Sequence, residues 1–139
     1  MYIFDSSAVG IVLKRLRGRA VEVLEGRTAL DLTGYELGNV VWKEFALKGV
    51  VDQEGATERA GGIAKIMGSM VKEEVESSEG FKGVMGLATL LRLTFYDASY
   101  LYIAKTKGLT LVTEDGELQE KARRAGVDAI SISEFTKGT

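Results

Sequence analysis

GLTLVTED, residues 108–115, is the stretch of sequence that decides the fold. A glycine that can end a helix comes first, five apolar or β-branched residues at 109–113 follow, and two acidic residues close the run, which is the pattern of a buried strand. The flanking segments 97–107 and 115–125 have the spacing of helices. Strands that alternate with helices of this length are typical of an α/β domain with a mostly parallel sheet.

The alternation continues from this stretch toward both ends of the chain. Further strands are predicted at 2–4, 28–32 and 127–132, and further helices at 6–17, 34–48, 53–71 and 81–91. Residues 72–80 are compatible with a helix end, a loop or a short edge strand around Val75. We expect Ser6 and Ser7 to cap the first helix and Thr33 to cap the second. Asp31 is expected inside a strand. The long helix carries an apolar stripe, expected to pack into the core, of Ile63, Ile66, Met67, Met70 and Val71.

The composition fits one globular domain and excludes several kinds of site. The chain has 139 residues, 45% of them apolar and 27% charged, and its formal charge is −2. This size and balance predict a single domain over residues 1–139, without a strongly basic field. Because there is no cysteine and no histidine, disulfides, Cys/His zinc sites and Ser-His or Cys-His nucleophile pairs are excluded.

The sequence contains no pattern of export, membrane insertion or nucleotide binding. No basic segment precedes the apolar run at 2–4, and no apolar run approaches 18 residues. We therefore expect a cytoplasmic protein with no membrane partner. Neither G-x-G-x-x-G nor G-x-x-x-x-G-K occurs, which disfavours nicotinamide enzymes and P-loop nucleotide enzymes.

Four acidic residues are predicted to gather at one edge of the sheet. Asp5 ends the first strand and Asp115 follows the strand at 109–113, so both belong to the carboxyl edge of a parallel sheet. Asp97 begins a helix and Glu36 lies near the start of another, and helix N-termini share that edge. The alternative is that these residues only cap helices, as Asp and Glu often do.

Such a cluster would have the chemistry of a metal site with oxygen ligands. Crowded carboxylates repel one another unless a cation lies among them, and oxygen ligands favour Mg²⁺ or Mn²⁺. A site of this type suits metal-assisted hydrolysis of a phosphodiester. Asn39, three residues after Glu36, and Thr113, two before Asp115, could reach the same site. Alternatively, Asn39 is simply exposed and Thr113 caps a helix.

Four segments together resemble the motifs of a known family. They are IFDSSA at 3–8, YELGNVVWK at 35–43, YDASYLYIA at 96–104 and LVTEDGEL at 111–118. In this order and spacing they resemble the PIN domain, and specifically the VapC toxin type of toxin–antitoxin pairs. The resemblance runs from residue 1 to about residue 132, and the segment 53–81 carries no motif of the family.

The resemblance implies a fold, an activity and a set of partners. The fold would be a three-layer α/β/α PIN-like domain, and the activity that of a Mg²⁺- or Mn²⁺-dependent endoribonuclease. Metal binding and catalysis would belong to Asp5, Glu36, Asp97 and Asp115, supported by Thr113, Asn39 and Ser6. The implied partners are an RNA substrate, a cognate VapB-like antitoxin and a second copy of the chain in a homodimer.

Two other functions stay open from the sequence. A catalytically weak PIN-fold module that binds RNA or protein is the first, and the complete acidic set argues against it. A receiver-like signalling domain is the second, but no acid adjoins Asp5 and no Lys lies in 127–132. Basic residues that could frame the site for RNA, unless they merely form solvated helix faces, are Lys14, Arg15, Arg17, Arg19, Lys105, Lys107, Lys121, Arg123 and Arg124.

Overall fold

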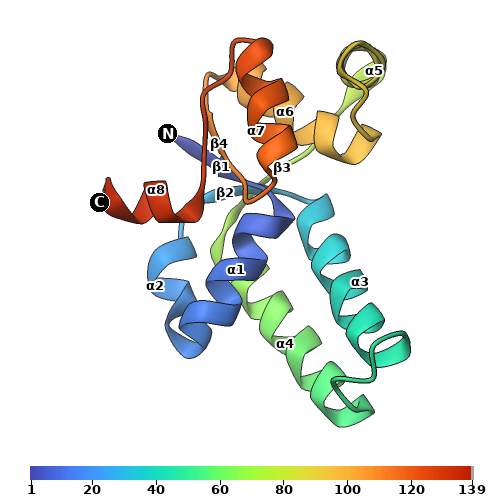
Figure 1. Cartoon of the computed structure of the whole chain (residues 1–139), viewed down its shortest axis with the longest axis vertical. Helices are drawn as coiled ribbons and strands as arrows, with labels where there is room; N and C mark the ends of the chain where they lie inside the picture. The colour runs from blue at the N-terminus through green and yellow to red at the C-terminus, as the bar shows by residue number, and fades with distance from the viewer. Residues whose placement is uncertain (139) are drawn as a thin grey trace.

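A sheet of parallel strands lies at the centre of the molecule (Figure 1). The structure, a computed structural model, describes residues 1–138. Five strands pair in the order β3-β2-β1-β4-β5, and every pair is parallel. Their bounds are β1 Tyr2–Phe4, β2 Thr28–Leu30, β3 Val71–Glu73, β4 Thr110–Val112 and β5 Ala129–Ile130. The predicted α/β class with a mainly parallel sheet is confirmed.

Helices cover both faces of the sheet, which gives three layers. They are α1 Ser6–Leu16, a 3₁₀ turn η1 Arg17–Arg19, α2 Ala20–Leu24, α3 Leu32–Ala46, α4 Gln53–Ser69, α5 Ser77–Leu91, α6 Phe95–Lys107, α7 Gly116–Arg124 and α8 Ile132–Lys137. The helices α1, α2, α4 and α8 pack on one face and α6 and α7 on the other, while α3 packs beside α4 and α5 beside α6 (Figure 1). Within residues 1–138, no helix combines the length and the apolar character needed to cross a bilayer.

Alternate residues of the two central strands face opposite layers. Ile3 and Leu111 are paired in register and pack under α6 and α7, while Phe4 and Val112 pack under α1 and α4. All four side chains are fully buried. The strands are therefore apolar on both faces, as expected of a parallel sheet covered by helices. Polar side chains consequently gather just beyond the carboxyl ends of β1 and β4.

Two helices are capped by a different residue from the one predicted. Asp5, not Ser6 or Ser7, caps α1, because its Oδ1 accepts a backbone N–H of the first turn at 2.9 Å. Asp31 lies outside β2 and caps α3 by accepting a backbone N–H at 2.9 Å. Thr33, the predicted cap, is fully buried inside that first turn. In both helices a carboxylate lies upstream of the hydroxyl and satisfies a free N–H group at the helix start.

The segment around residue 72 contains the edge strand of the sheet. Strand β3 begins at Val71, so it lies before Val75, and α4 ends at Ser69, two residues before the predicted end of the helix at Val71. Val71 is exposed because it belongs to this edge strand. The other four residues of the apolar stripe on α4 are buried in the core, as predicted, and these are Ile63, Ile66, Met67 and Met70.

Candidate active site

The candidate site lies at the carboxyl ends of β1 and β4, where the strand order reverses. The neighbour β2 follows β1 in the chain, whereas β4 is reached only after a crossover through α5 and α6. Ligands of open α/β sheets bind at this kind of switch point. Asp5 directly follows β1 and Thr113 directly follows β4, and the Asp5 N–H donates to the Val112 carbonyl at 3.1 Å. The topology thus brings together residues 108 positions apart in the chain.

Asp5 is the most deeply buried acid of the site, with 4% of its surface exposed. Its Oδ1 accepts the Ser7 hydroxyl at 2.7 Å and the Ala8 N–H at 2.9 Å, and its Oδ2 accepts the Thr113 hydroxyl. Burial raises the pKa of Asp5 above its usual range, the three donors partly counteract this, and the charge of Asp115 adds to the increase. Asp5 is therefore a desolvated carboxyl group that three donors hold in one orientation.

Two hydroxyl groups connect the end of β1 to the end of β4. Besides donating to Asp5, Thr113 Oγ1 accepts the Asp115 N–H at 3.1 Å. It also lies 3.2 Å from Ser7 Oγ, which in turn accepts the Glu114 N–H at 3.0 Å. Sequence reasoning placed Thr113 here but missed Ser7, whose position two residues after Asp5 was the available signal.

Glu36 reaches the site from α3 and is held by hydroxyl groups of two other helices. Tyr100 on α6 donates to Glu36 Oε1 at 2.7 Å, and Ser6 on α1 supplies a second hydrogen bond. Burial raises the pKa of Glu36, the bond from Tyr100 counteracts this, and the charge of Asp5 raises the pKa again. Tyr100 was not predicted at the site, although it lies one helical turn after Asp97.

Asp97 lies in the first turn of α6, and its pKa is affected by the charges of the three other acids. Its pKa is raised to about 6, first by burial and then by the negative charges of Asp5, Asp115 and Glu36, with Glu117 contributing least. Charges separated by solvent affect one another appreciably only over short distances. The structure therefore brings the four predicted acids into one neighbourhood, and we call Asp5, Glu36, Asp97 and Asp115 the acidic cluster.

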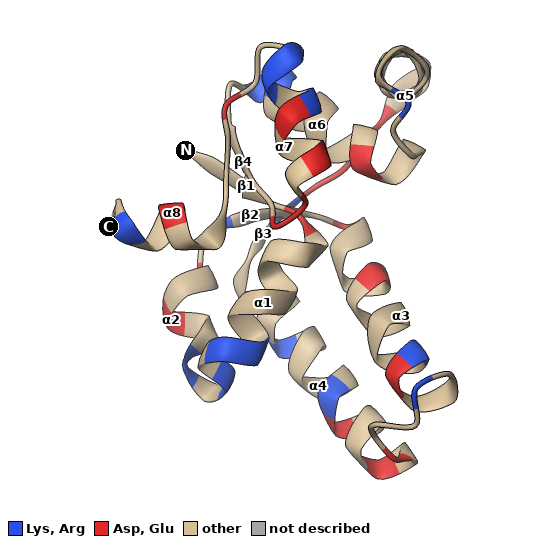
Figure 2. Cartoon of the chain, in the orientation of Figure 1, with Lys and Arg blue, Asp and Glu red and all other residues tan. Residues whose placement is uncertain are grey.

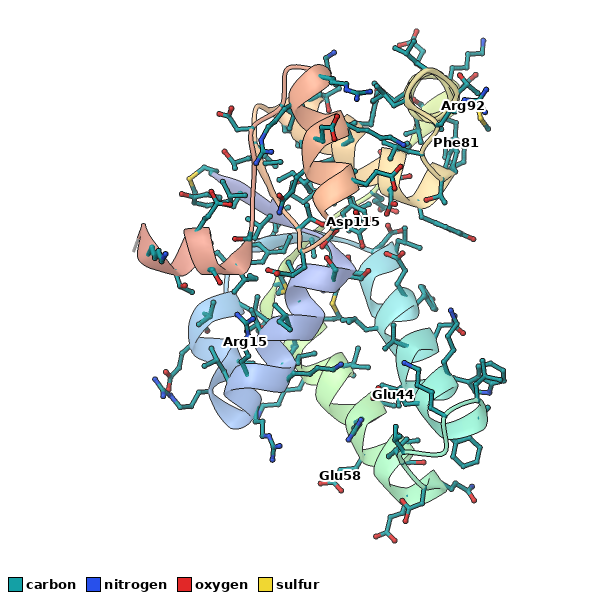
Figure 3. The ribbon with its side chains drawn as sticks, viewed as in Figure 1. Arg15, Glu44, Glu58, Phe81, Arg92 and Asp115 are labelled. Atoms are coloured by element: carbon teal, nitrogen blue, oxygen red, sulfur yellow. The ribbon has the colours of Figure 1, made fainter. Side chains whose placement is uncertain are left out.

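The remaining predicted positions are more exposed. Asp115 caps α7 by accepting two backbone N–H groups of its first turn, at 2.9 and 3.2 Å, and Figure 3 shows it in the loop between β4 and α7. Asp5 and Asp115 are thus helix caps and members of the acidic cluster at once, so the two interpretations do not exclude each other. Asn39 lies one turn after Glu36 on α3, and its exposed side chain bonds to none of residues 1–138.

The acidic cluster fits a divalent cation in its chemistry but not in its present side-chain positions. Among residues 1–138, no three acidic side chains are arranged so that they could hold a metal ion as they stand. The available donors are all carboxylate oxygens, which Mg²⁺ and Mn²⁺ prefer, and their mutual repulsion is what a cation would relieve. Binding an ion would therefore require rotations that bring the carboxylates closer together.

Most of the basic residues expected to frame the site lie away from it. They occupy the C-terminal ends of α1, α6 and α7 and the turn after α1, and they are Lys14, Arg15, Arg17, Arg19, Lys105, Lys107, Arg123 and Arg124. Helices that connect parallel strands run back against them, so these ends lie far from the carboxyl ends of the strands. Figure 2 shows the blue segments at the far ends of α1 and α7, and Figure 3 shows Arg15 well apart from Asp115. The predicted basic frame is wrong for these eight residues.

Comparison with known proteins gives similarity over most of the chain, although no protein-family model matches it. The exonuclease VapC9 of Pyrobaculum aerophilum is 38% identical over 125 residues, which cover 89% of this chain and 87% of the relative. The ribonuclease VapC3 of the same organism is 32% identical over 104 residues, 74% of this chain and 76% of the relative. The crystal structure of PAE2754 from Pyrobaculum aerophilum has a TM-score of 0.79 and 33% identity, and the match covers 96% of this chain and 90% of the other.

Proposed function

Because the chain belongs to the VapC family of PIN-domain toxins, we propose that it is a Mg²⁺- or Mn²⁺-dependent endoribonuclease and the toxin of a type II toxin–antitoxin pair. The observation that carries the proposal is the acidic cluster, in which burial and then the charges of three other acids raise the pKa of Asp97 to about 6. Such repulsion destabilises the fold unless a cation relieves it. A cluster of acids that lowers the stability of the metal-free fold in this way supports a role in binding a divalent ion.

The roles of the side chains follow from their positions. A divalent cation, when bound, supplies a Lewis acid for the scissile phosphate and lowers the pKa of a water molecule. The four acids of the cluster would hold it, and their all-oxygen donor set suits Mg²⁺ or Mn²⁺. Thr113 and Ser7 fix the orientation of Asp5 in advance, since both donate to its carboxyl group.

We propose internal cleavage of RNA, whereas one relative is named an exonuclease, so the mode of cleavage needs a test of its own. A circular single-stranded RNA has no ends, so only an endonuclease can open it. We expect the purified protein, freed of any partner, to linearise such a circle with Mg²⁺ or Mn²⁺ and to lose this activity in EDTA. The measurement is gel analysis of the circle beside linear RNA and linear single-stranded DNA of the same sequence.

The outcomes of this assay distinguish three functions. If the protein cleaves linear RNA or linear DNA but leaves the circular RNA intact, the activity is that of an exonuclease and not of an endoribonuclease. Loss of circle cleavage in Asp5→Asn, with full activity in Asp128→Asn, would support the acidic cluster, because Asp128 is an exposed acid at the opposite edge of the sheet. A folded protein that neither cleaves nor binds Mn²⁺ would favour the PIN-fold RNA- or protein-binding module.

We also propose that the chain forms a homodimer and binds a VapB-type antitoxin. Large apolar side chains that are exposed on α3 and α5 support an interaction surface, and they include Trp42, Phe45, Phe81 and Met85. Trp42 and Phe45 also line a shallow apolar groove between α3 and α4. Light scattering of the purified chain is expected to give twice the mass of 15.1 kDa. A mass of one chain at micromolar concentration would contradict the homodimer.

A further inference from the structure

The hydroxyl of Tyr100 belongs to a buried series of hydrogen bonds that begins at the sheet. Tyr100 and Thr33 have no exposed surface. Thr33 Oγ1 accepts the Leu30 N–H at 3.2 Å and lies 2.7 Å from the Tyr100 hydroxyl. Tyr100 then donates to Glu36 Oε1 at 2.7 Å. The series thus runs from the end of β2 through α3 and α6 to an acid of the cluster.

Counting protons gives this series a single direction. An ionised carboxylate only accepts, so the one proton of the Tyr100 hydroxyl must go to Glu36. Thr33 must therefore donate its own proton to the Tyr100 oxygen, and its oxygen remains free to accept the Leu30 N–H. Each hydroxyl is polarised by the one before it, which strengthens the final bond to the carboxylate.

This arrangement opposes the repulsion between Glu36 and its acidic neighbours. Glu36 is half-buried and faces the charge of Asp5, and its own charge acts on Asp97. A glutamate on a helix surface can relieve such repulsion by turning toward solvent. We propose that Tyr100 is a positioning residue, whose hydroxyl, anchored through Thr33 to the backbone of β2, holds the Glu36 carboxylate where the acidic cluster would bind a divalent cation.

The inference rests on the proposed role of Glu36 as a metal ligand, so the test measures metal binding as well as activity. Free Mn²⁺ is measured by electron paramagnetic resonance during titration of the full chain and its variants. We expect Tyr100→Phe to raise the Mn²⁺ dissociation constant about 10- to 100-fold, as the loss of a hydrogen-bonded neighbour of a metal ligand does. The ring still fills its place in the core, but the buried Thr33 hydroxyl loses its acceptor, so the melting temperature without metal should fall moderately while the protein stays folded.

Matched variants separate positioning from general damage. Tyr102→Phe is the control, since Tyr102 lies on the same helix and its hydroxyl bonds to none of residues 1–138. Its Mn²⁺ affinity should equal that of the wild type. Thr33→Val should weaken Mn²⁺ binding and Thr33→Ser should not, and this pair decides the matter if Tyr100→Phe does not fold.

The results also distinguish a failure of this inference from a failure of the proposed function. Weaker Mn²⁺ binding in Glu36→Gln with unchanged binding in Tyr100→Phe would overturn the positioning role and leave the metal site standing. Mn²⁺ binding that Glu36→Gln does not alter would overturn both. Weaker binding in Tyr100→Phe and Thr33→Val, with normal binding in Tyr102→Phe and Thr33→Ser, is the expected result.

Discussion

Asp97→Asn is expected to stabilise the metal-free protein while it lowers RNA cleavage about 1000-fold. The loss of activity follows because a metal-bound Lewis acid is worth several kcal/mol of transition-state stabilisation, and about 1.4 kcal/mol is a factor of ten. The gain in stability follows because the variant removes a negative charge that is disfavoured first by burial and then by three like charges. Opposite signs for activity and stability are the signature of an acid kept for function.

The raised pKa of Asp97 determines how the stability difference between the wild type and Asp97→Asn depends on pH. The pKa of Asp97 is about 6 in the folded protein against 3.8 for the free group. As the pH rises from about 4 to about 6, the unfolded chain loses its proton first, so the free energy of unfolding of the wild type falls. Above pH 6 Asp97 is ionised in both states, and the loss in the free energy of unfolding reaches its full value. This loss amounts to about 2 kcal/mol after allowance for solvent screening, or about 5 °C in melting temperature.

Thermal unfolding in EDTA between pH 4 and pH 8 measures this effect. The variant and the wild type should unfold at nearly the same temperature at pH 4 and diverge toward pH 7. Asp128→Asn is the control, since it removes an exposed acid from the opposite edge of the sheet. An Asp97→Asn protein that keeps full activity, or that melts with the wild type at every pH, would contradict the assignment.

Thr113→Val is expected to have the largest destabilising effect among single hydroxyl deletions at the site. Valine has the shape of threonine, but it leaves the buried Asp5 Oδ2 without the Thr113 donor and the Asp115 N–H without its acceptor. Leaving buried polar groups unsatisfied costs about 1–3 kcal/mol each, and more for a charged group. We expect the free energy of unfolding at pH 7 to fall by about 3 kcal/mol and cleavage to fall about 100-fold.

Urea denaturation of Thr113→Val and Thr113→Ser tests this prediction. The Thr113 hydroxyl lowers the pKa of Asp5. Its removal therefore raises that pKa, and the destabilisation should grow as the pH rises and Asp5 must ionise. Serine retains the hydroxyl and should recover most of the stability and the activity. Equal loss in both variants would mean that packing of the methyl group, and not the hydrogen bond, holds this position.

The core of the fold could be predicted because its signals are local. The strand at 109–113 lies between a glycine and an acidic turn, and the stripe on α4 repeats with the period of a helix. The start of α3 was predicted wrongly, because Asp31 was expected inside the strand and Thr33 at the cap, whereas Asp31 is the cap. The choice depends on tertiary contacts, because Thr33 is turned inward toward Tyr100.

The acids of the cluster could be predicted from position, but their partners could not. A carboxylate that follows a parallel strand must lie at the carboxyl edge of the sheet, and this places Asp5 and Asp115 without knowledge of packing. Ser7 and Tyr100 act through hydrogen bonds that cross between distant helices and strands. No periodicity in the sequence reports which of several hydroxyl groups points toward the site.

The strand order of the sheet also determines when in its synthesis the chain can assemble the acidic cluster. A nascent chain that ends after α5 contains Asp5 and Glu36 but lacks Asp97, Asp115 and β4, which is one of the two strands that pair with β1. Contacts across 108 positions form late, since closing so long a loop is slow. A ribosome can therefore complete the message of such a nuclease before the emerging polypeptide is able to cut it.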